Sequence, residues 1–470
     1  MNRINKIIRM GIFSAVIGAV SVSCSNDFVE REFFQEEEQA PLTTVNQIQA
    51  FINGCYASMR SATYYGSDFM AYGEVRSDEM YSNLSAGYYQ NVMNYTMLSN
   101  DSYAVSTYNQ IYTMIGKANI VINTDMATIE GTELDRKNAR YAQGQAYGLR
   151  AIGFFDVFRL YGQKYIPGGT LGVVLPLEYD PKNLQPRATI AETEKQIEAD
   201  FSKALDLMMA NGSASNVAKT ELTINALKGM MSRYYLYKKD YPKVRSLTND
   251  LIGKYTIASA ALLQETFRFT MNGAAPNSIF ELAVGINGSL STDSYQYKLN
   301  PDGYGNVVVS EVAYNSYADN DVRKSFIVTL GGERYLSSGA NSNGIGKYTQ
   351  AVGADNIKML RYEEILLNGI EAELNGGSSA KALEYYNQII TNRGLAASGT
   401  VDMTLLKTER MKELLGEGLR QWDLRRWGDS VPRPDGASTD ANLNAFPIPR
   451  GETDISGTPV VANPGYDNSN

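Results

Sequence analysis

A mostly α-helical scaffold, interrupted by long loop and short-strand insertions, is the fold class that the sequence predicts. Several long segments place apolar residues three and four positions apart, the spacing of one helix face. A clear case runs through Ile111, Met114, Ile115, Ala118 and Ile122. Stretches dense in tyrosine, glycine and asparagine lie between such segments. Apolar residues make up 43% of the 470 residues and charged residues 20%, a globular composition able to bury a large core.

Residues 1–23 have the pattern of an export signal. A basic start, MNRINKIIR, precedes a 13-residue apolar stretch, MGIFSAVIGAVSV, which is too short to span a bilayer. Ser23 and Cys24 follow, and a small residue before a cysteine at this place resembles a lipoprotein signal. Cleavage just before Cys24 by an ordinary signal peptidase is the alternative. We predict lipid attachment at Cys24, and an anchored rather than membrane-spanning protein.

The helical elements follow in order after a polar, acidic segment, 24–42, which we expect to be a tether. Residues 43–470 are expected to form a single domain. Thr43 or Thr44 is predicted to cap the first helix. After the helix through Ile111–Ile122, another long helix is expected over 139–162, and Thr189 with Glu192 has the spacing of a capping box at the start of the next.

Two later segments, 223–254 and 359–394, each look like a pair of helices joined by a tight turn. Pro242 opens the second helix of the first pair, and Ser378 or Ser379 caps the second helix of the other. At roughly 34 residues per unit, both resemble tetratricopeptide-like helix pairs. They are more than 100 residues apart, so they do not form a continuous tandem array.

The insertions cover about 61–101 and 280–354. The second contains the strand-like stretches SIFELAV and NVVVSEV, with turn signals at Pro301-Asp302-Gly303 and Gly331-Gly332. Loops of this length within a compact chain are usually functional. We therefore look for the site there.

Composition excludes several kinds of chemistry. The chain has no histidine, which removes the commonest general base and the commonest transition-metal ligand. The formal charge is −8, and loss of residues 1–23 with Arg3, Lys6 and Arg9 would leave about −11, which argues against nucleic acid as a partner. Asp319-Asn320-Asp321 lacks the rest of an EF-type calcium loop, so Asp321 and Arg323 are expected to form a structural ion pair. No metal and no cofactor is predicted.

Ordered landmarks along the chain resemble one family. The signal ending at Cys24 comes first, then GQAYGLRAIGFFDVFRLYG (144–162), MLRYEEILLNGIEAELNGG (359–377), ERMKELLGEGLRQWDLRRWGD (409–429), FPIPRGE and the terminal NPGY. In this order and spacing the chain resembles the SusD/RagB family of outer-membrane nutrient-binding lipoproteins of Bacteroidetes. The resemblance implies four tetratricopeptide-like helix pairs and a place on the cell surface over a TonB-dependent, SusC-like transporter. It also implies oligosaccharide ligands, or peptides in some relatives, and no catalysis.

Carbohydrate binding requires flat aromatic faces and polar partners for hydroxyl groups, and both insertions supply them. The candidate ligand contacts are Asp78, Tyr81, Asn83, Tyr88, Tyr89, Tyr95, Tyr295, Tyr297 and Tyr304. For each tyrosine the alternative is packing between helices with the hydroxyl reaching water. Asp78 is included through the resemblance, because ligand contacts in the family commonly come from an S-D-E-like turn after the first helix.

Both tryptophans, Trp422 and Trp427, lie in the segment GEGLRQWDLRRWGD. If 409–422 is one helix at about 100° per residue, apolar residues including Leu419 and Trp422 share one face and charged residues the opposite face. This pattern predicts a packed helix rather than a sugar platform, with Trp422 and Asp423 buried. The expected structural network comprises Glu413, Glu417, Arg420, Trp422, Asp423, Arg426 and Trp427. Any aromatic platform must then consist of tyrosine or phenylalanine.

Three functional classes follow from these observations. A glycan-degrading enzyme would need two carboxylates flanking a sugar bond; Asp78 with Glu79, or Glu413 with Glu417, could supply them, but acids this close occur in almost any protein. A tetratricopeptide-type scaffold that binds only protein is the second class. The lipoprotein signal together with the Tyr- and Asn-rich insertions favours the third, a surface nutrient-binding protein that takes oligosaccharides or peptides, without catalytic residues.

Overall fold

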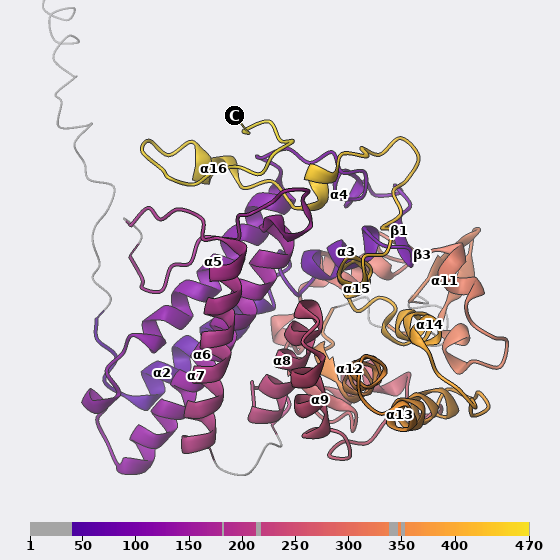
Figure 1. The fold of residues 1–470 in the computed structure, drawn as a ribbon, viewed down its shortest axis with the longest axis horizontal. Coiled ribbons are helices and arrows are strands. Elements are labelled where there is room, and N and C mark those ends of the chain that lie inside the picture. The colour runs from indigo at the N-terminus through magenta and orange to yellow at the C-terminus, as the bar shows by residue number, and fades with distance from the viewer. Residues whose placement is uncertain (1–39, 181–182, 213–217, 338–345, 349–352, 470) are drawn as a thin grey trace, which may run out of the picture. The chain divides into compact units, whose positions relative to one another are not determined.

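The computed structural model describes residues 40–180, 183–212, 218–337, 346–348 and 353–469. The predicted signal, Cys24 and nearly all of the predicted tether therefore lie outside the described residues. One compact unit spans Leu42–Asn470. Its described part is mostly helical with a few short strands, which confirms the predicted fold class (Figure 1).

The long helices carry the scaffold. They are α2 (Val45–Met59), α5 (Ser102–Ile122), α6 (Glu133–Tyr161), α7 (Ile190–Asn211), α8 (Ile224–Lys238), α9 (Tyr241–Asn249), α12 (Tyr362–Leu374), α13 (Ser379–Thr391) and α14 (Met403–Leu414). The shorter ones are α3 (Asp68–Val75), α4 (Gln90–Met93), α10 (Tyr295–Leu299), α11 (Glu311–Asn315), α15 (Arg420–Trp427) and α16 (Arg450–Thr453). Short 3₁₀ turns connect several of them.

The helices pack in two neighbouring groups (Figure 1). In one group α6 lies against α5 and α7, and α2 lies against α5 and α6. In the other, α9 packs against α8 and α12, and α12 packs against α13 and α14. The two helix–turn–helix segments predicted from the sequence are present as α8–α9 and α12–α13. Their tetratricopeptide character stays a prediction.

Local capping explains where these helices begin. Thr44 and Gln47 form a capping box at α2, and Thr189 and Glu192 form the predicted one at α7. Such boxes satisfy two backbone N–H groups that the first turn leaves free. Ser378 caps α13, and Pro242 lies in the first turn of α9, where its missing N–H costs nothing.

The described residues include six short strands, which form three antiparallel pairs. They are β1 (Met80–Ser82) with β3 (Val307–Val309), β2 (Ser278–Leu282) with β6 (Ile357–Arg361), and β4 (Val328–Leu330) with β5 (Glu333–Tyr335). β2 and β3 fall within the two stretches predicted as strands. β6 corrects the expectation that the helix pair begins at residue 359. Residues Ile357–Arg361 extend because they pair with β2, and the helix starts only at Tyr362.

The predicted single helix over 409–422 is also wrong. Helix α14 ends at Leu414, and α15 begins at Arg420. Gly416 and Gly418 lie between them with φ of +77° and +75°, a left-handed conformation that only glycine adopts without strain. Gly418 also lies directly against α3, since a Cβ at Gly73 would be 2.1 Å from the Gly418 carbonyl oxygen. The tight contact between these two backbones therefore ends the helix.

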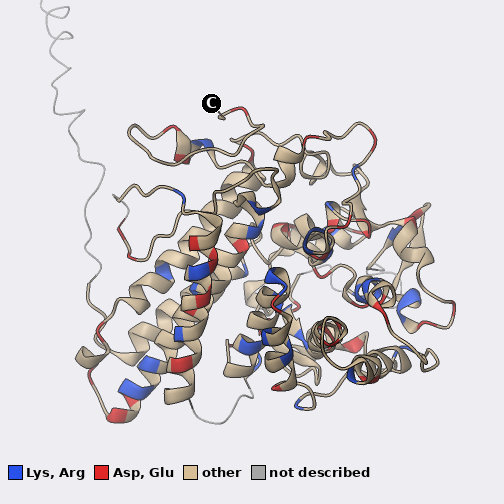
Figure 2. Ribbon diagram, in the orientation of Figure 1, with Lys and Arg blue, Asp and Glu red and all other residues tan. Residues whose placement is uncertain are grey.

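Charged residues of both signs are spread over the described helices. Basic and acidic residues are interspersed along the helices rather than gathered by sign (Figure 2). Within the described ranges, none of the helices combines the length and the apolarity needed to cross a bilayer.

Candidate functional site

The two insertions predicted to be functional meet at one place. β1 pairs with β3, with Tyr81 opposite Val308. Beyond the strands, the Asn83 N–H donates to the Asn306 carbonyl at 2.9 Å, and the Asn306 side-chain amide donates to the Tyr88 carbonyl at 3.2 Å. Segments more than 200 residues apart in sequence are thereby joined along their backbones. The pairing explains why the predicted aromatic residues of both insertions come together.

Three tyrosines at this junction are half-buried and keep part of each side chain open to solvent. They are Tyr88, Tyr297 and Tyr304, and we call them the tyrosine cluster. The ring centroids of Tyr88 and Tyr304 are 4.6 Å apart, with the planes at 43°. Those of Tyr297 and Tyr304 are 5.0 Å apart and nearly perpendicular, at 80°. Aromatic pairs at these separations support one another's orientation. The cluster therefore offers fixed apolar faces partly open to solvent.

The Tyr88 hydroxyl is a donor at neutral pH. A hydrogen bond with Tyr304, together with partial burial, raises the pKa of Tyr88 to about 12. A phenol this weakly acidic keeps its proton, so Tyr88 presents an apolar ring and a polar hydroxyl group. Such groups suit a ligand with both apolar faces and hydroxyl groups.

Backbone strain concentrates in the same two segments. Among the described residues, five non-glycine positions have positive φ. Four of them lie in the insertions: Leu84 at +68°, Tyr89 at +61°, Tyr95 at +56° and Ser291 at +49°. Each such residue costs on the order of 1 kcal/mol or more and is found mostly at functional sites. The strain supports the placement of a site here independently of residue composition.

Charged groups that the sequence analysis missed surround the tyrosine cluster. The Lys298 ammonium lies 3.6 Å from the Tyr88 ring centroid and 4.3 Å from that of Tyr304. Asp68, the first residue of α3, accepts a hydrogen bond from the Tyr89 hydroxyl at 2.8 Å. Burial raises the pKa of Asp68 to about 6. Nothing in the sequence near Asp68 marks it, because Lys298 lies 230 positions away.

A second set of half-buried aromatic residues continues the face through the β4–β5 hairpin, since β5 lies against β3. The Tyr81 hydroxyl donates to Glu333 Oε2 at 2.8 Å. The Arg334 guanidinium lies over Tyr314, with its carbon 5.0 Å from the ring centroid. Tyr81 was predicted from the sequence, whereas the residues of α11 and the hairpin were not. Their alternation in a short, polar hairpin gives no distinctive signal.

Three predicted ligand contacts are corrected by the structure. Tyr89, Tyr95 and Tyr295 are buried, with exposures of 0%, 2% and 4%, and therefore have no face open to a ligand. The Tyr95 ring lies under two guanidinium carbons, those of Arg76 at 3.9 Å and Arg433 at 3.8 Å from its centroid. These tyrosines are part of the core, the alternative interpretation given by the sequence.

Asp78 and Asn83 are present at the junction but already bonded. Both carboxylate oxygens of Asp78 accept hydrogen bonds from Arg420, at 2.6 and 2.7 Å. The Asn83 side-chain amide donates to the Gly305 carbonyl at 3.0 Å, and its oxygen accepts from the Ser85 N–H at 3.1 Å. Both residues hold the loops in place rather than offering free groups.

The tryptophan segment is part of the core. Trp422 and Asp423 are each 4% exposed, which confirms their predicted burial. Asp423 accepts from Arg410 at 2.6 Å and from Arg426 at 2.8 Å. The half-buried Trp427 donates its indole N–H to Glu371 at 3.1 Å. Neither indole forms an open platform.

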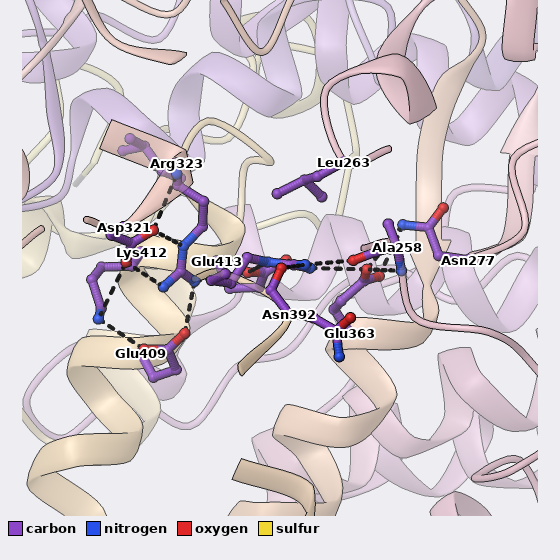
Figure 3. Close-up of polar contacts among 12 residues, drawn as sticks. Ala258, Leu263, Asn277, Asp321, Arg323, Glu363, Asn392, Glu409, Lys412 and Glu413 are labelled. Carbon is purple, nitrogen blue, oxygen red and sulfur yellow. Dashed lines mark hydrogen bonds and ion pairs between the residues drawn. The ribbon is translucent and has the colours of Figure 1, made fainter. Parts of the chain in front are cut away.

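Glu413 lies at the centre of a buried ion network (Figure 3). Its carboxylate accepts from Arg323 and Arg361 at 2.7 Å and from Arg393 at 2.8 Å. Arg323 also binds Asp321 and Glu409, at 2.7 Å each, so the predicted Asp321–Arg323 pair is present. Burial alone would raise the pKa of Glu413, but the guanidinium groups hold it well below its usual range. The adjoining cavity, of about 20 Å³, has room for about one water, so no sugar fits there.

The candidate catalytic acids are occupied or enclosed. Asp78 is paired with Arg420 and Glu79 is 1% exposed. Glu417 accepts from Lys347 at 2.6 Å as well as from Arg361. In the part of the chain that the structure describes, no group of three or more cysteine, aspartate and glutamate residues is placed to hold a metal ion.

Comparison with known proteins gives a consistent set of matches. Residues 32–236 match a family model described as starch-binding associating with outer membrane, and residues 294–446 match the model of the SusD family. The chain is similar to SusD-like protein P2 of Formosa agariphila, at 24% identity over 90% of this chain and 93% of that protein.

Solved structures with the same fold include a SusD superfamily protein from Bacteroides vulgatus, at 26% identity and a TM-score of 0.77, which covers 90% of this chain and 100% of that one. They also include surface glycan-binding protein A from Bacteroides thetaiotaomicron in complex with laminarihexaose, at 17% identity and a TM-score of 0.70, with 90% and 100% covered. The second likeness concerns the fold alone.

Proposed function

The chain belongs to the SusD/RagB family, and from this we propose that it is a cell-surface nutrient-binding protein that captures oligosaccharides. The observation that carries the proposal is the tyrosine cluster, in which Tyr88, Tyr297 and Tyr304 hold their rings partly open to solvent at a strained junction of two insertions. Rings of this kind match the apolar faces of sugars, and the hydroxyl and carboxylate groups beside them match sugar hydroxyls.

Binding without catalysis is the proposed activity. Retaining and inverting glycosidases need two carboxylates facing the scissile bond. The acids that the sequence offered in pairs are bonded to arginine or buried in the described structure. The role proposed for this face is therefore to hold a glycan.

Membership of this family also supports a proposed location and a proposed partner. The description of its N-terminal model places such proteins at the outer membrane. We propose that acylated Cys24 anchors the chain there and that a TonB-dependent, SusC-like transporter is its partner. Co-purification of such a transporter with the protein from membranes would support the pairing, and its absence under gentle solubilisation would count against it.

Binding is tested with a glycan array followed by calorimetry on purified protein. Tyr88→Ala and Tyr304→Ala each remove one exposed ring, and loss of a ring contact of about 1.5 kcal/mol weakens binding about tenfold. A dissociation constant about ten times larger is expected for each variant with whichever glycan the wild type binds.

Tyr179→Ala is the matched control, because Tyr179 is 59% exposed and lies outside the tyrosine cluster. It should bind as the wild type does. Equal affinity in all four proteins would contradict the proposed site. Binding of peptides but no glycan on the array would instead favour a peptide nutrient.

A further inference from the structure

Asp68 has a free carboxylate oxygen beside the tyrosine cluster. Oδ1 accepts from the Tyr89 hydroxyl at 2.8 Å. Oδ2 accepts no hydrogen bond from a described residue, and it is not one of the buried atoms closed to solvent. Tyr89 follows Tyr88 directly, and their ring centroids are 6.2 Å apart. Asp68 is thereby linked to the tyrosine cluster through Tyr89. It also interacts electrostatically with Lys298, whose ammonium lies over the Tyr88 ring.

The other charges at the tyrosine cluster are arranged unequally. Lys298 is 3% exposed, and its ammonium is occupied by the rings of Tyr88 and Tyr304 and by the Thr292 carbonyl at 3.3 Å. Asp293, by contrast, is exposed, and its carboxylate has no hydrogen bond or ion pair with a described residue. The cation is thus turned into the protein, while two carboxylates remain open to a ligand.

Arg334, in the neighbouring β4–β5 hairpin, does not add an open positive charge to the tyrosine cluster. The Arg334 guanidinium lies over Tyr314, and Glu333 precedes it on the same strand. Two carboxylates and one enclosed ammonium, that of Lys298, therefore give the tyrosine cluster a net negative charge.

We propose that Asp68, assisted by Asp293, makes this site selective for uncharged, hydroxyl-rich sugar rings and against rings that carry carboxylate or sulfate groups. A free carboxylate oxygen accepts a charge-assisted hydrogen bond from a sugar hydroxyl group, which stabilises the complex. It opposes an anionic substituent by like-charge repulsion in a partly desolvated place, and specificity is the difference between these two terms. The inference rests on the proposed function and names the ligand class of the same site.

The test compares matched polysaccharides by affinity electrophoresis on the full-length protein. The probes are laminarin and pullulan, each beside its sulfated derivative, and methyl-esterified beside free-acid oligogalacturonide. The wild type should bind the neutral member of at least one pair about tenfold or more tightly than the charged member. Asp68→Asn should weaken binding of the neutral member about tenfold, because it loses a charged acceptor, and should bind the anionic member as well as or better than the wild type does.

Asp293→Asn provides a second variant, because an exposed carboxylate with no hydrogen bond or ion pair to a described residue can be changed with little effect on folding. Asp293→Asn should also reduce the preference for the neutral over the anionic glycan, by a smaller factor than Asp68→Asn does. Equal or tighter binding of the charged members by the wild type would overturn the inference alone, as would an unchanged preference in both variants. Failure of the wild type to bind any neutral or anionic glycan, here and on the array, would overturn the proposed function as well.

Discussion

Replacing Glu413 by glutamine would test whether the buried ion network holds the fold together. The carboxylate takes four hydrogen bonds from three arginines, two of them from Arg393. Glutamine keeps the shape but has one acceptor oxygen and turns two donors toward guanidinium groups. Removing one partner of a buried ion pair costs about 3–5 kcal/mol, because the opposite charge stays buried.

The expected loss is about 4 kcal/mol, within this range, because each arginine keeps at least one other carboxylate. Arg323 keeps Asp321 and Glu409, Arg361 keeps Glu363 and Glu417, and Arg393 keeps Glu363. A unit of about 430 residues has an unfolding entropy of about 0.9 kcal/mol/K. The melting temperature should therefore fall by about 4–5 °C.

Urea denaturation followed by circular dichroism measures the loss, with an unchanged slope showing that only stability has altered. Glu133→Gln is the matched control, because Glu133 also pairs with two arginines, Arg136 and Arg140, but on the surface with 71% of its side chain exposed. Its denaturation midpoint should equal that of the wild type. The reasoning would be refuted if Glu413→Gln were within about 1 kcal/mol of the wild type in stability, which is about a quarter of the expected loss. It would also be refuted if Glu413→Gln were no less stable than Glu133→Gln.

Two further predictions concern the turn that leads into β1. Burial and the neighbouring Glu74 raise the pKa of Glu79 well above its ordinary value of 4.5, so the folded state favours the protonated acid. The stability that this acid contributes is complete below about pH 4.5 and is lost as pH rises through the raised folded value. Glu79→Gln should therefore match the wild type at pH 4.5 and be the more stable protein at pH 8.5 in urea titrations; parallel pH profiles would contradict this. Asp78→Asn, which breaks the bidentate pair with Arg420, should lower stability by about 1 kcal/mol and leave glycan affinity unchanged in calorimetry. If Asp78→Asn bound glycan more weakly and were as stable as the wild type, Asp78 would be a ligand contact after all.

Local sequence patterns predicted much of the fold because their causes are local. Thr189 and Glu192 lie three residues apart and cap a helix through contacts within one turn. The single helix expected over 409–422 failed for a reason that is not local. Gly418 is left-handed where the backbone of α3 lies against it, and Gly73 meets it from more than 300 positions away.

The sequence likewise predicted one part of the candidate site and not another. The density of tyrosine and asparagine indicated which two insertions to consider, and burial of Trp422 followed from its apolar neighbours. Which tyrosines remain open did not follow, because Tyr88 and Tyr89 are adjacent yet one is half-buried and the other enclosed. The environment of Tyr88 includes Lys298, which lies more than 200 positions away and is brought near where β1 pairs with β3. Tyr89 is instead enclosed with its hydroxyl bonded to Asp68.

By itself, then, the sequence determined the helical class, the caps, the absence of histidine chemistry and the two insertions in which to look for a site, since composition and short-range periodicity suffice for each. Tertiary structure alone decided that Tyr88, Tyr297 and Tyr304 form one open cluster, that Arg420 occupies Asp78, and that Asp68 keeps a free oxygen beside the rings. The physical reason is that exposure and hydrogen-bond partners are properties of contacts between residues hundreds of positions apart, and such contacts leave no periodic trace in the chain.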